Sequence, residues 1–301
     1  MVDVVVVGTM AFDDIRTPFG MVNRVLGGSA SYFSLASSFF CKPGVVSIVG
    51  SDFSKKEFSV FENKKIDLSG VEKASGLSFF WSGYYEFDLN QAHTVETQLN
   101  VLEKFNPVLP ESFRSADFLF LGNISPELQL NVLSQMKKKP KLVVSDTMNF
   151  WIKQNPLKVK EVIKKVDIAL MNESEARQLF ETHKLYSAAK KILELDSKYA
   201  IIKKGEHGAL MFTRDSSFFV PGFPIEKIVD PTGAGDSFAG GLMGYLAKEG
   251  KVNEATLRKA MVYGSAVASI CVEDFSTNAL QNASRKTIEK RVKEFKKMVE
   301  F

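Results

Sequence analysis

Cysteine and histidine are scarce in this sequence, whose 301 residues include two cysteines and three histidines. The cysteines, Cys41 and Cys271, are far apart, and neither forms a CxxC pair or lies near a histidine. A disulfide framework and a structural zinc site both require such spacings, so the sequence predicts neither of them. We expect two reduced thiols and a cytoplasmic protein.

Long apolar runs and a large excess of one charge are also missing. No stretch of about eighteen apolar residues occurs, so no transmembrane helix is expected. The N-terminal segment carries Asp3 where a signal peptide has a basic residue, and we interpret it as a buried strand. The 39 basic and 35 acidic side chains leave a net charge of +4, which is too small and dispersed to indicate nucleic acid or a membrane as a partner.

Apolar residues, in contrast, are abundant enough for a large core: they make up 45% of the chain and include 25 phenylalanines. Short apolar runs alternate with helix-like segments, as in FLFLG (118–122), KLVVSD (141–146), DIALMN (167–172) and YAIIKKG (199–205). This order indicates a parallel sheet covered by helices on both faces, which binds ligands at the carboxyl ends of its strands. No repeat or linker divides the chain, so we predict one α/β domain over residues 1–301.

The segment SGLSFFWSGYYEFDL (75–89) interrupts this alternation of strands and helices. Its aromatic and polar residues roughly alternate, as in an antiparallel strand with one exposed face. We interpret it as part of a small β lid formed by about 12–24 and 75–100, and an ordinary edge hairpin is the alternative. Exposed aromatic residues on such a strand are favourable where they cover a ligand or pair with the lid of a second chain. The sequence therefore leaves open whether two chains form a homodimer through their lids.

Residues 229–241, VDPTGAGDSFAGG, place three small residues directly before Asp236. The first N–H groups of a helix attract anions, so a carboxylate there needs an explanation. One explanation is that Asp236 accepts the proton of a neutral hydroxyl while the turn holds a phosphate. The alternative is that Asp236 caps a helix that begins at Ser237. No GxxxxGK[ST] segment occurs, and Phe238 replaces the third glycine of a GxGxxG pattern.

The run DPTGAGDSFAGGLMGYLA resembles the C-terminal signature of the ribokinase-like (PfkB) family of carbohydrate and nucleoside kinases. Further segments follow the order of that family: GTMAFD, GGSASYFSLASSF (27–39), NESE (172–175) and KKGEHG (203–208). Together they span nearly the whole chain. The resemblance implies a three-layer α/β/α fold with a mostly parallel central sheet and a small β lid.

The resemblance also implies a mechanism. Asp236 would be the general base that accepts the proton of the acceptor hydroxyl as it attacks the γ-phosphate of ATP. The backbone N–H groups of Gly233, Ala234 and Gly235 would form an anion hole for the transferred group.

Cofactor residues are implied in the same way. Asn172 and Glu175 would organise Mg²⁺ through waters, although their spacing also suits a helix cap. The loop with Lys204, Gly205 and Gly208 would run along the nucleotide, although its two lysines also suit a solvated surface. The resemblance adds Thr232 and Ser265 to the nucleotide side, and a monovalent cation such as K⁺ beside Asp230.

On the acceptor side, the resemblance implies that Asp13 bonds substrate hydroxyls; its neighbour Asp14 is the alternative. Gly27 and Gly28 permit close backbone approach. Tyr32 stands where such sequences often carry asparagine, and with Trp81 it would form an aromatic wall that favours an acceptor larger than a simple pentose. Asp146 and Asn149 follow another strand, where a substrate contact and a turn role are both open.

We therefore expect an ATP- and Mg²⁺-dependent kinase that phosphorylates a hydroxymethyl group of a small sugar or sugar derivative. A nucleoside (adenosine-like) kinase is the first alternative. A catalytically silent sugar- or nucleotide-binding protein on the same fold is the second. Asp236 argues against the silent protein, because a binding protein needs no base at that position.

Overall fold

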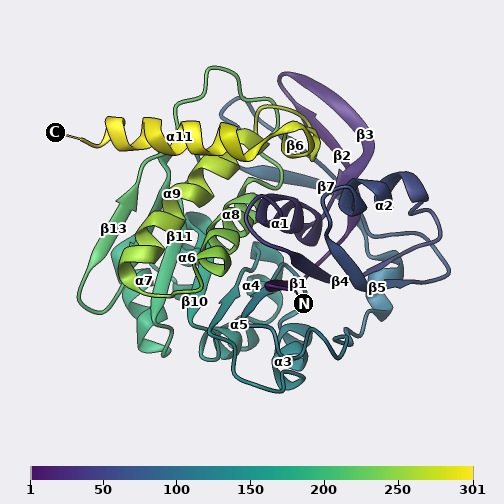
Figure 1. Cartoon of the computed structure of the whole chain (residues 1–301), viewed down its shortest axis with the longest axis horizontal. Helices are drawn as coiled ribbons and strands as arrows, with labels where there is room; N and C mark the ends of the chain where they lie inside the picture. Colours follow the sequence, from purple (N-terminus) through teal and green to yellow (C-terminus); the bar gives the residue numbers. More distant parts are fainter. Residues whose placement is uncertain (1, 301) are drawn as a thin grey trace.

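The computed structural model describes residues 2–300, and its main feature is a nine-stranded sheet (Figure 1). The strands of this sheet are β1 (Val4–Val7), β4 (Pro43–Val49), β5 (Asp67–Lys73), β8 (Phe118–Leu121), β9 (Leu142–Ser145), β10 (Ile168–Asn172), β11 (Tyr199–Lys203), β12 (Ala209–Phe212) and β13 (Ser217–Val220). Their order is β13-β12-β11-β10-β9-β8-β1-β4-β5. All pairs from β11 to β5 are parallel, and β12 and β13 are antiparallel. The expected mostly parallel sheet is confirmed.

Helices cover both faces of this sheet (Figure 1). They are α1 (Ser29–Ser37), α2 (Lys55–Glu62), α3 (Pro126–Ser134), α4 (Asn149–Gln154), α5 (Pro156–Ile163), α6 (Glu173–Phe180), α7 (Leu185–Glu194), α8 (Ala234–Glu249), α9 (Glu254–Cys271), α10 (Asn278–Asn282) and α11 (Arg285–Met298), with short 3₁₀ turns η1 (Asn100–Lys104) and η2 (Gly205–His207). No helix within residues 2–300 combines the length and apolar content that crossing a bilayer requires.

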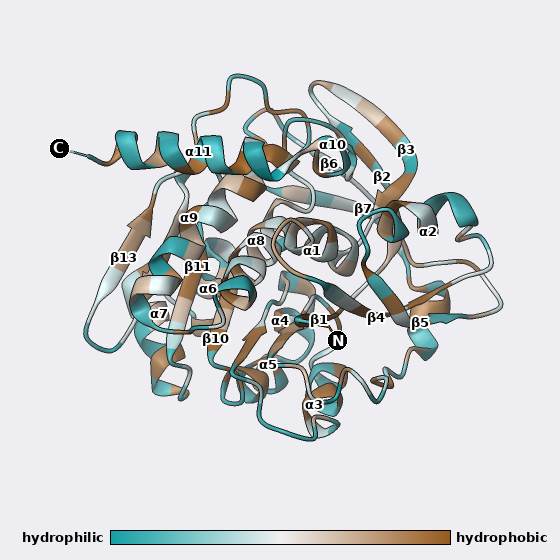
Figure 2. Ribbon diagram, viewed as in Figure 1, coloured by the Kyte–Doolittle hydropathy of each residue, from teal (hydrophilic) through white to brown (hydrophobic). Residues whose placement is uncertain are grey.

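The alternation of side chains along β1 explains the three layers. Val4 and Val6 pack into the core beneath α1, α8 and α9, whereas Val5 and Val7 pack into the core beneath α3 and α5. Every residue of β1 is therefore buried, as a strand covered on both faces requires. Figure 2 shows brown, apolar residues along β10, whereas α11 at the surface alternates teal and brown bands.

A second, four-stranded sheet stands beside the main sheet, at the upper right of Figure 1. Its strands are β2 (Ala11–Thr17), β3 (Gly20–Gly27), β6 (Phe80–Tyr85) and β7 (Ala92–Gln98), in the order β3-β2-β6-β7. These strands come from the two segments that the sequence assigns to the lid. Asp13 is the register partner of Trp81 in the parallel pair of β2 and β6, so both side chains project from one face of this sheet. The homodimer through the lid stays a prediction.

Glycines let α8 pack closely against α1 and α9. A Cβ on Gly240 would lie 2.4 Å from the carbonyl oxygen of Phe33 in α1. A Cβ on Gly241 would lie 3.0 Å from the Cα of Gly264 in α9. Since neither distance leaves room for a side chain, these contacts fix α8, and with it the segment 233–236 at its start.

We expect Gly240→Ala to destabilise the protein by about 1–3 kcal/mol, because the added methyl group forces α8 and α1 apart. Urea unfolding followed by circular dichroism measures this change. Lys248→Ala, at an exposed position of the same helix, is the control and is expected to stay within about 0.5 kcal/mol of the original protein. Equal unfolding midpoints for the two variants would contradict the close-packing argument.

Candidate active site

The candidate site lies at the carboxyl edge of the central sheet. Asp146 directly follows β9, Asn172 ends β10 and Lys203 ends β11. Asn172 and Lys203 are register partners in neighbouring strands. Parallel strands end at one edge of the sheet, so these side chains are brought together beside the start of α8.

The start of α8 differs from the alternative in which Asp236 caps a helix beginning at Ser237. The helix begins at Ala234, Gly233 occupies the cap position, and Asp236 is the third helical residue. The reason is the backbone of Gly233, which has φ of 75° and whose carbonyl already accepts the N–H of Ser237 at 2.8 Å. A Cβ on Gly233 would also lie 2.3 Å from the ring of Tyr32. Asp236 is therefore not the helix cap.

The N–H groups at this helix start are only partly engaged. The N–H of Ala234 donates to the carbonyl of Pro231 at 3.1 Å, closing a turn. The N–H groups of Gly233 and Gly235 donate to no group within residues 2–300. Two of the three predicted anion-hole donors are thus available at the positive end of a 16-residue helix.

Asp236 itself accepts no side-chain hydrogen bond from the described residues and is partly buried. Burial raises the pKa of Asp236 to about 7; the charge of Asp146 adds to this rise, and that of Lys203 opposes it. A carboxylate that titrates near neutral pH and accepts a hydrogen bond only from its own backbone N–H is suited to accept a proton.

Lys203 and Asp146 form an ion pair next to Asp236. The sequence leaves a substrate contact and a turn role open for Asp146 and predicts no specific role for Lys203. The ammonium of Lys203 donates to Oδ2 of Asp146 at 2.8 Å, and 14% and 6% of the two side chains are exposed. The resemblance pointed to Lys204 in the same segment, but Lys204 forms no ion pair in the described chain. The signal that could have found Lys203 is its place as the last residue of a buried strand, at the edge where ligands bind.

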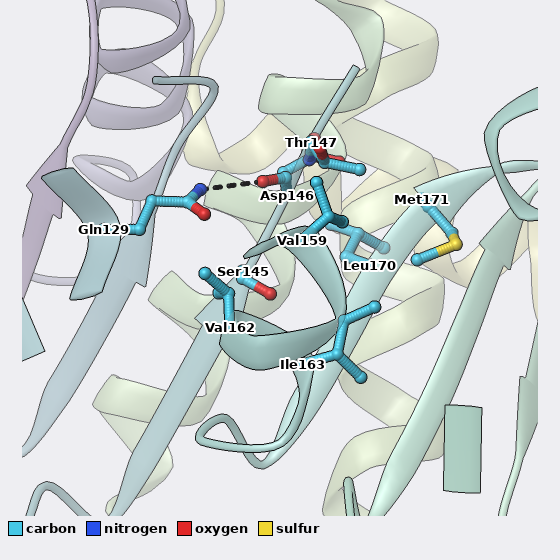
Figure 3. Close-up of a pocket in the computed structure, with 9 residues that line it drawn as sticks. All are labelled: Gln129, Ser145, Asp146, Thr147, Val159, Val162, Ile163, Leu170 and Met171. Carbon is cyan, nitrogen blue, oxygen red and sulfur yellow. Dashed lines mark hydrogen bonds between the residues drawn. The ribbon is translucent and has the colours of Figure 1, made fainter. Parts of the chain in front are cut away.

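Asp146 is held firmly from both sides. Its Oδ1 accepts the N–H of Thr147 at 3.0 Å. Figure 3 shows a pocket beneath it, in which the side chain of Gln129 donates to the Asp146 carbonyl at 2.9 Å. Aliphatic side chains of α5 and β10 line one part of this pocket, and polar residues that include Gln129 and Thr147 line the rest. The bond from Gln129 fixes the Asp146 backbone. Asn149 instead donates to Gln178 at 2.5 Å.

Asn172 and Glu175 form a helix cap at the start of α6. Oδ1 of Asn172 accepts the N–H of Glu175 at 2.8 Å, and Oε2 of Glu175 accepts the N–H of Asn172 at 2.7 Å. Burial and the charge of Asp146 raise the pKa of Glu175 to about 8 against the opposing charge of Lys203. The capping role is confirmed. The Mg²⁺ role stays a prediction, and residues 2–300 hold no cluster of three or more His, Cys, Asp or Glu side chains suited to a metal.

Asp13 is a buried acid without a partner. Its side chain is 4% exposed and accepts no hydrogen bond from the described chain. It lies over Gly27, where a Cβ would be 1.8 Å from Oδ2 of Asp13. Burial, followed by the charges of Asp230 and Asp236, raises the pKa of Asp13 well above its ordinary value. Asp14, by contrast, accepts the N–H of Arg24 at 2.6 Å.

Glycines on the acceptor side and in the predicted nucleotide loop adopt backbone conformations that other residues rarely adopt. Gly28 has φ of 93°, and a Cβ there would lie 2.4 Å from the carbonyl oxygen of Thr9. In the predicted nucleotide loop, Gly205 and Gly208 have φ of 55° and 85°, and the N–H of Lys204 donates to the Gly208 carbonyl at 2.7 Å. Both segments therefore need glycine for their backbone conformation.

Tyr32 does not form an open aromatic wall. Its side chain is 1% exposed, and its ring lies against Gly233. The ring fills the space left by the missing Cβ, which is why an aromatic residue is accommodated there. Trp81 is partly exposed on the face of the small sheet that carries Asp13, and its Nε1–H donates to Thr94 at 3.1 Å.

Two further contacts surround the loop before α8. Asp230 is 1% exposed, and its carboxylate accepts the N–H groups of Thr232 at 2.8 Å and Ser276 at 2.9 Å. The Thr232 hydroxyl donates to the hydroxyl of Tyr85 at 3.2 Å, which ties this loop to the small sheet. The Ser265 hydroxyl donates to the Pro221 carbonyl at 3.3 Å. The roles of Asp230 toward a cation and of Ser265 toward a nucleotide stay predictions.

Known proteins share this arrangement of sequence and fold. The chain is 32% identical over 254 residues to a cytidine kinase of Thermococcus kodakarensis, covering 81% of this chain and 89% of the relative. An inositol 3-kinase of Arabidopsis thaliana is 27% identical over 281 residues, which are 90% of this chain and 74% of that protein.

Solved structures agree on the fold. A nucleoside kinase of Methanocaldococcus jannaschii, described as an archaeal member of the ribokinase family, has a TM-score of 0.75 at 20% identity, covering 97% of this chain and 98% of that one. A putative ribokinase II of E. coli has a TM-score of 0.81 at 17% identity, covering 97% and 99%. Residues 2–283 match the model of the pfkB family carbohydrate kinases. The chain therefore belongs to the pfkB family and is a kinase, a phosphotransferase of the carbohydrate and nucleoside kinase class.

Proposed function

We propose that this kinase transfers the γ-phosphoryl group of ATP to the hydroxymethyl group of a nucleoside, with cytidine as the first candidate. The observation that carries the proposal is a pair of carboxylates, neither of which accepts a hydrogen bond from another described residue: Asp13 in β2 of the small sheet and Asp236 at the start of α8. An acceptor between them has one group to bind its hydroxyls and another to take its proton.

Asp236 performs the proton transfer in this proposal. It accepts the proton of the acceptor hydroxyl, whose oxygen forms the new bond to phosphorus, while the bond to the departing ADP breaks and its electron pair passes to ADP. The N–H groups of Gly233 and Gly235 bind the charge on the transferred group, because they are otherwise unpaired in the described chain.

The chain also fits ATP and Mg²⁺. The unpaired N–H groups at the start of α8 suit a phosphate, and the loop 204–208 suits the nucleotide. Glu175 and Asn172 would hold Mg²⁺ through waters, since an oxygen-rich buried group suits this cation. ATP supplies the phosphoryl group, and Mg²⁺ neutralises its charge. A solved structural neighbour, a putative ribokinase II of E. coli, is described in complex with both.

A nucleoside is favoured over a bare sugar by the residues beside Asp13. Trp81 shares its face of the small sheet and offers an indole on which a planar base can stack. The 32% identical relative is a cytidine kinase, and two of the solved neighbours are nucleoside kinases. These observations support a nucleoside, which is itself a sugar derivative with a hydroxymethyl group.

An acceptor panel tests the proposal. ADP release is measured with cytidine, adenosine, ribose and myo-inositol, and we expect saturable activity with a nucleoside and weak activity with ribose. Trp81→Ala should raise the KM for the nucleoside by about tenfold, since base stacking on an aromatic side chain contributes about 1–3 kcal/mol. Tyr84→Ala is the control, because Tyr84 projects from the opposite face of β6 and stacks on His93. Efficient turnover of ribose or inositol, with the nucleoside KM unchanged by Trp81→Ala, would contradict the nucleoside assignment.

A further inference from the structure

Lys203 brings a buried positive charge into a group of carboxylates. Its ammonium is 2.8 Å from Asp146, and the charges of Glu175 and Asp236 act on it as well. Burial acts to lower the pKa of Lys203, but the attraction of these three carboxylates outweighs it and raises the pKa above the ordinary value. Lys203 is therefore protonated at neutral pH.

The same ammonium lies directly against the anion-binding turn. A Cβ built on Gly235 would be 2.8 Å from Nζ of Lys203, so the ammonium lies close to the backbone of this residue. Gly235 is also one of the two residues of this turn with an unpaired N–H within residues 2–300. The ammonium of Lys203 therefore lies close to a backbone segment that carries a free N–H group.

We propose that Lys203 is a catalytic residue, whose ammonium binds the transferred phosphoryl group together with the N–H groups of the Gly233–Gly235 turn. The inference rests on the proposed phosphoryl transfer. Lys203 makes and breaks no covalent bond and keeps its proton; it offsets the negative charge that gathers on the transferred group. Its positive charge also favours the ionised form of Asp236, which is the form that accepts the acceptor proton.

Asp146 acts through Lys203 and is a positioning residue. One carboxylate oxygen accepts the Thr147 N–H and the other accepts Lys203, while Gln129 fixes the Asp146 carbonyl. This network holds the ammonium at the end of β11 before a nucleotide arrives. A buried ion pair that served stability alone would have no need to lie against Gly235.

The first test compares nucleotide binding by calorimetry. Lys203→Met should weaken the binding of Mg·ATP at least tenfold more than that of Mg·ADP, because only ATP carries the group that Lys203 contacts. Lys203→Arg, which keeps the charge, should retain most of the preference. Lys198→Met, which removes the lysine paired with Asp167 at the opposite end of β11, is the matched control and should change neither affinity.

The second test uses turnover. We expect Lys203→Met to lower kcat about 10²- to 10³-fold, as the loss of one preorganised charge-stabilising group does elsewhere. The acid limb of the kcat/KM profile should move to higher pH in Lys203→Met, since the charge that favours ionised Asp236 is gone. In Asp146→Asn it should move to lower pH, because a repelling carboxylate is lost. These shifts report the charges beside Asp236, whereas the loss of kcat and of the ATP preference separates phosphate binding from a purely structural ion pair.

The outcomes separate the two proposals. If the unaltered protein phosphorylates no acceptor, the proposed function fails, and the comparison of ATP with ADP still tests Lys203. Equal losses of ATP and ADP affinity in Lys203→Met, with kcat within a fewfold of the original, would overturn the role of Lys203. If Lys203→Met does not fold, Asp146→Asn, which removes the partner that holds the ammonium, carries the test. A preference for ATP over ADP and a kcat that Asp146→Asn leaves unchanged would overturn the proposal.

Discussion

Asp236→Asn will lower kcat by about 10²- to 10⁴-fold, which is the usual contribution of a general base. The amide has nearly the shape of the carboxylate but accepts no proton at neutral pH, and the helix start that is proposed to bind phosphate stays intact. The affinity for Mg·ATP should therefore remain within a fewfold of that of the unaltered protein. Rates of ADP release with the acceptor found in the panel, together with calorimetric ATP titration, measure both quantities.

The pH profile provides the companion measurement. Because the pKa of Asp236 is raised to about 7, the base is protonated and inactive below that pH and becomes active as the pH rises through it. The kcat/KM of the unaltered enzyme should therefore increase across this range, and the residual activity of Asp236→Asn should lack this limb. Asp274→Asn, at an exposed position, is the control. Turnover of Asp236→Asn within a fewfold of the original would remove the base assignment.

Asp13→Asn will have the next largest effect, and it will separate activity from stability. Loss of a charged hydrogen bond to the acceptor should lower kcat/KM for the acceptor about 10- to 100-fold. The melting temperature should rise, because an uncompensated buried carboxylate repelled by Asp230 and Asp236 has been neutralised.

Asp14→Asn is the matched control for Asp13→Asn. Asp14 neighbours Asp13 in β2, but its carboxylate accepts the backbone N–H of Arg24. The kcat/KM of the Asp14→Asn variant for the acceptor should therefore be unchanged. Thermal melts and initial rates at limiting acceptor settle both parts of the prediction. A lower melting temperature for Asp13→Asn, with unchanged kcat/KM, would show that Asp13 is a structural residue.

The parts of the fold that depend on local patterns could be predicted from the sequence. The apolar run at Val4–Val7 and the runs ending at Asp146 and Asn172 indicated buried parallel strands, because residues covered on both faces must all be apolar. The aromatic alternation at 75–89 indicated the small sheet for the opposite reason, since one of its faces is exposed.

The errors arose where contacts distant in sequence decide the structure. The start of α8 moved from Ser237 to Ala234 because Gly233 adopts positive φ above the ring of Tyr32, a residue from another helix. The same contact buries Tyr32, although its aromatic side chain predicts a wall beside the acceptor. The pairing of Lys203 could not be predicted, because its partner, Asp146, follows a different strand and is 57 residues away in the sequence.

The bonds around Asp230 make the two halves of the site a single cooperative unit. Its carboxylate accepts the N–H groups of Thr232 and Ser276, and the Ser276 hydroxyl donates to the carbonyl of Leu26, beside the two glycines that are predicted to lie on the acceptor side. Opening the loop before α8 therefore also releases the segment around Leu26. In hydrogen exchange, the amides of this loop and of the Leu26 segment should lose their protection together. Under the proposed function, the native state itself would thus maintain the alignment of acceptor with phosphate, before either substrate contributes binding energy.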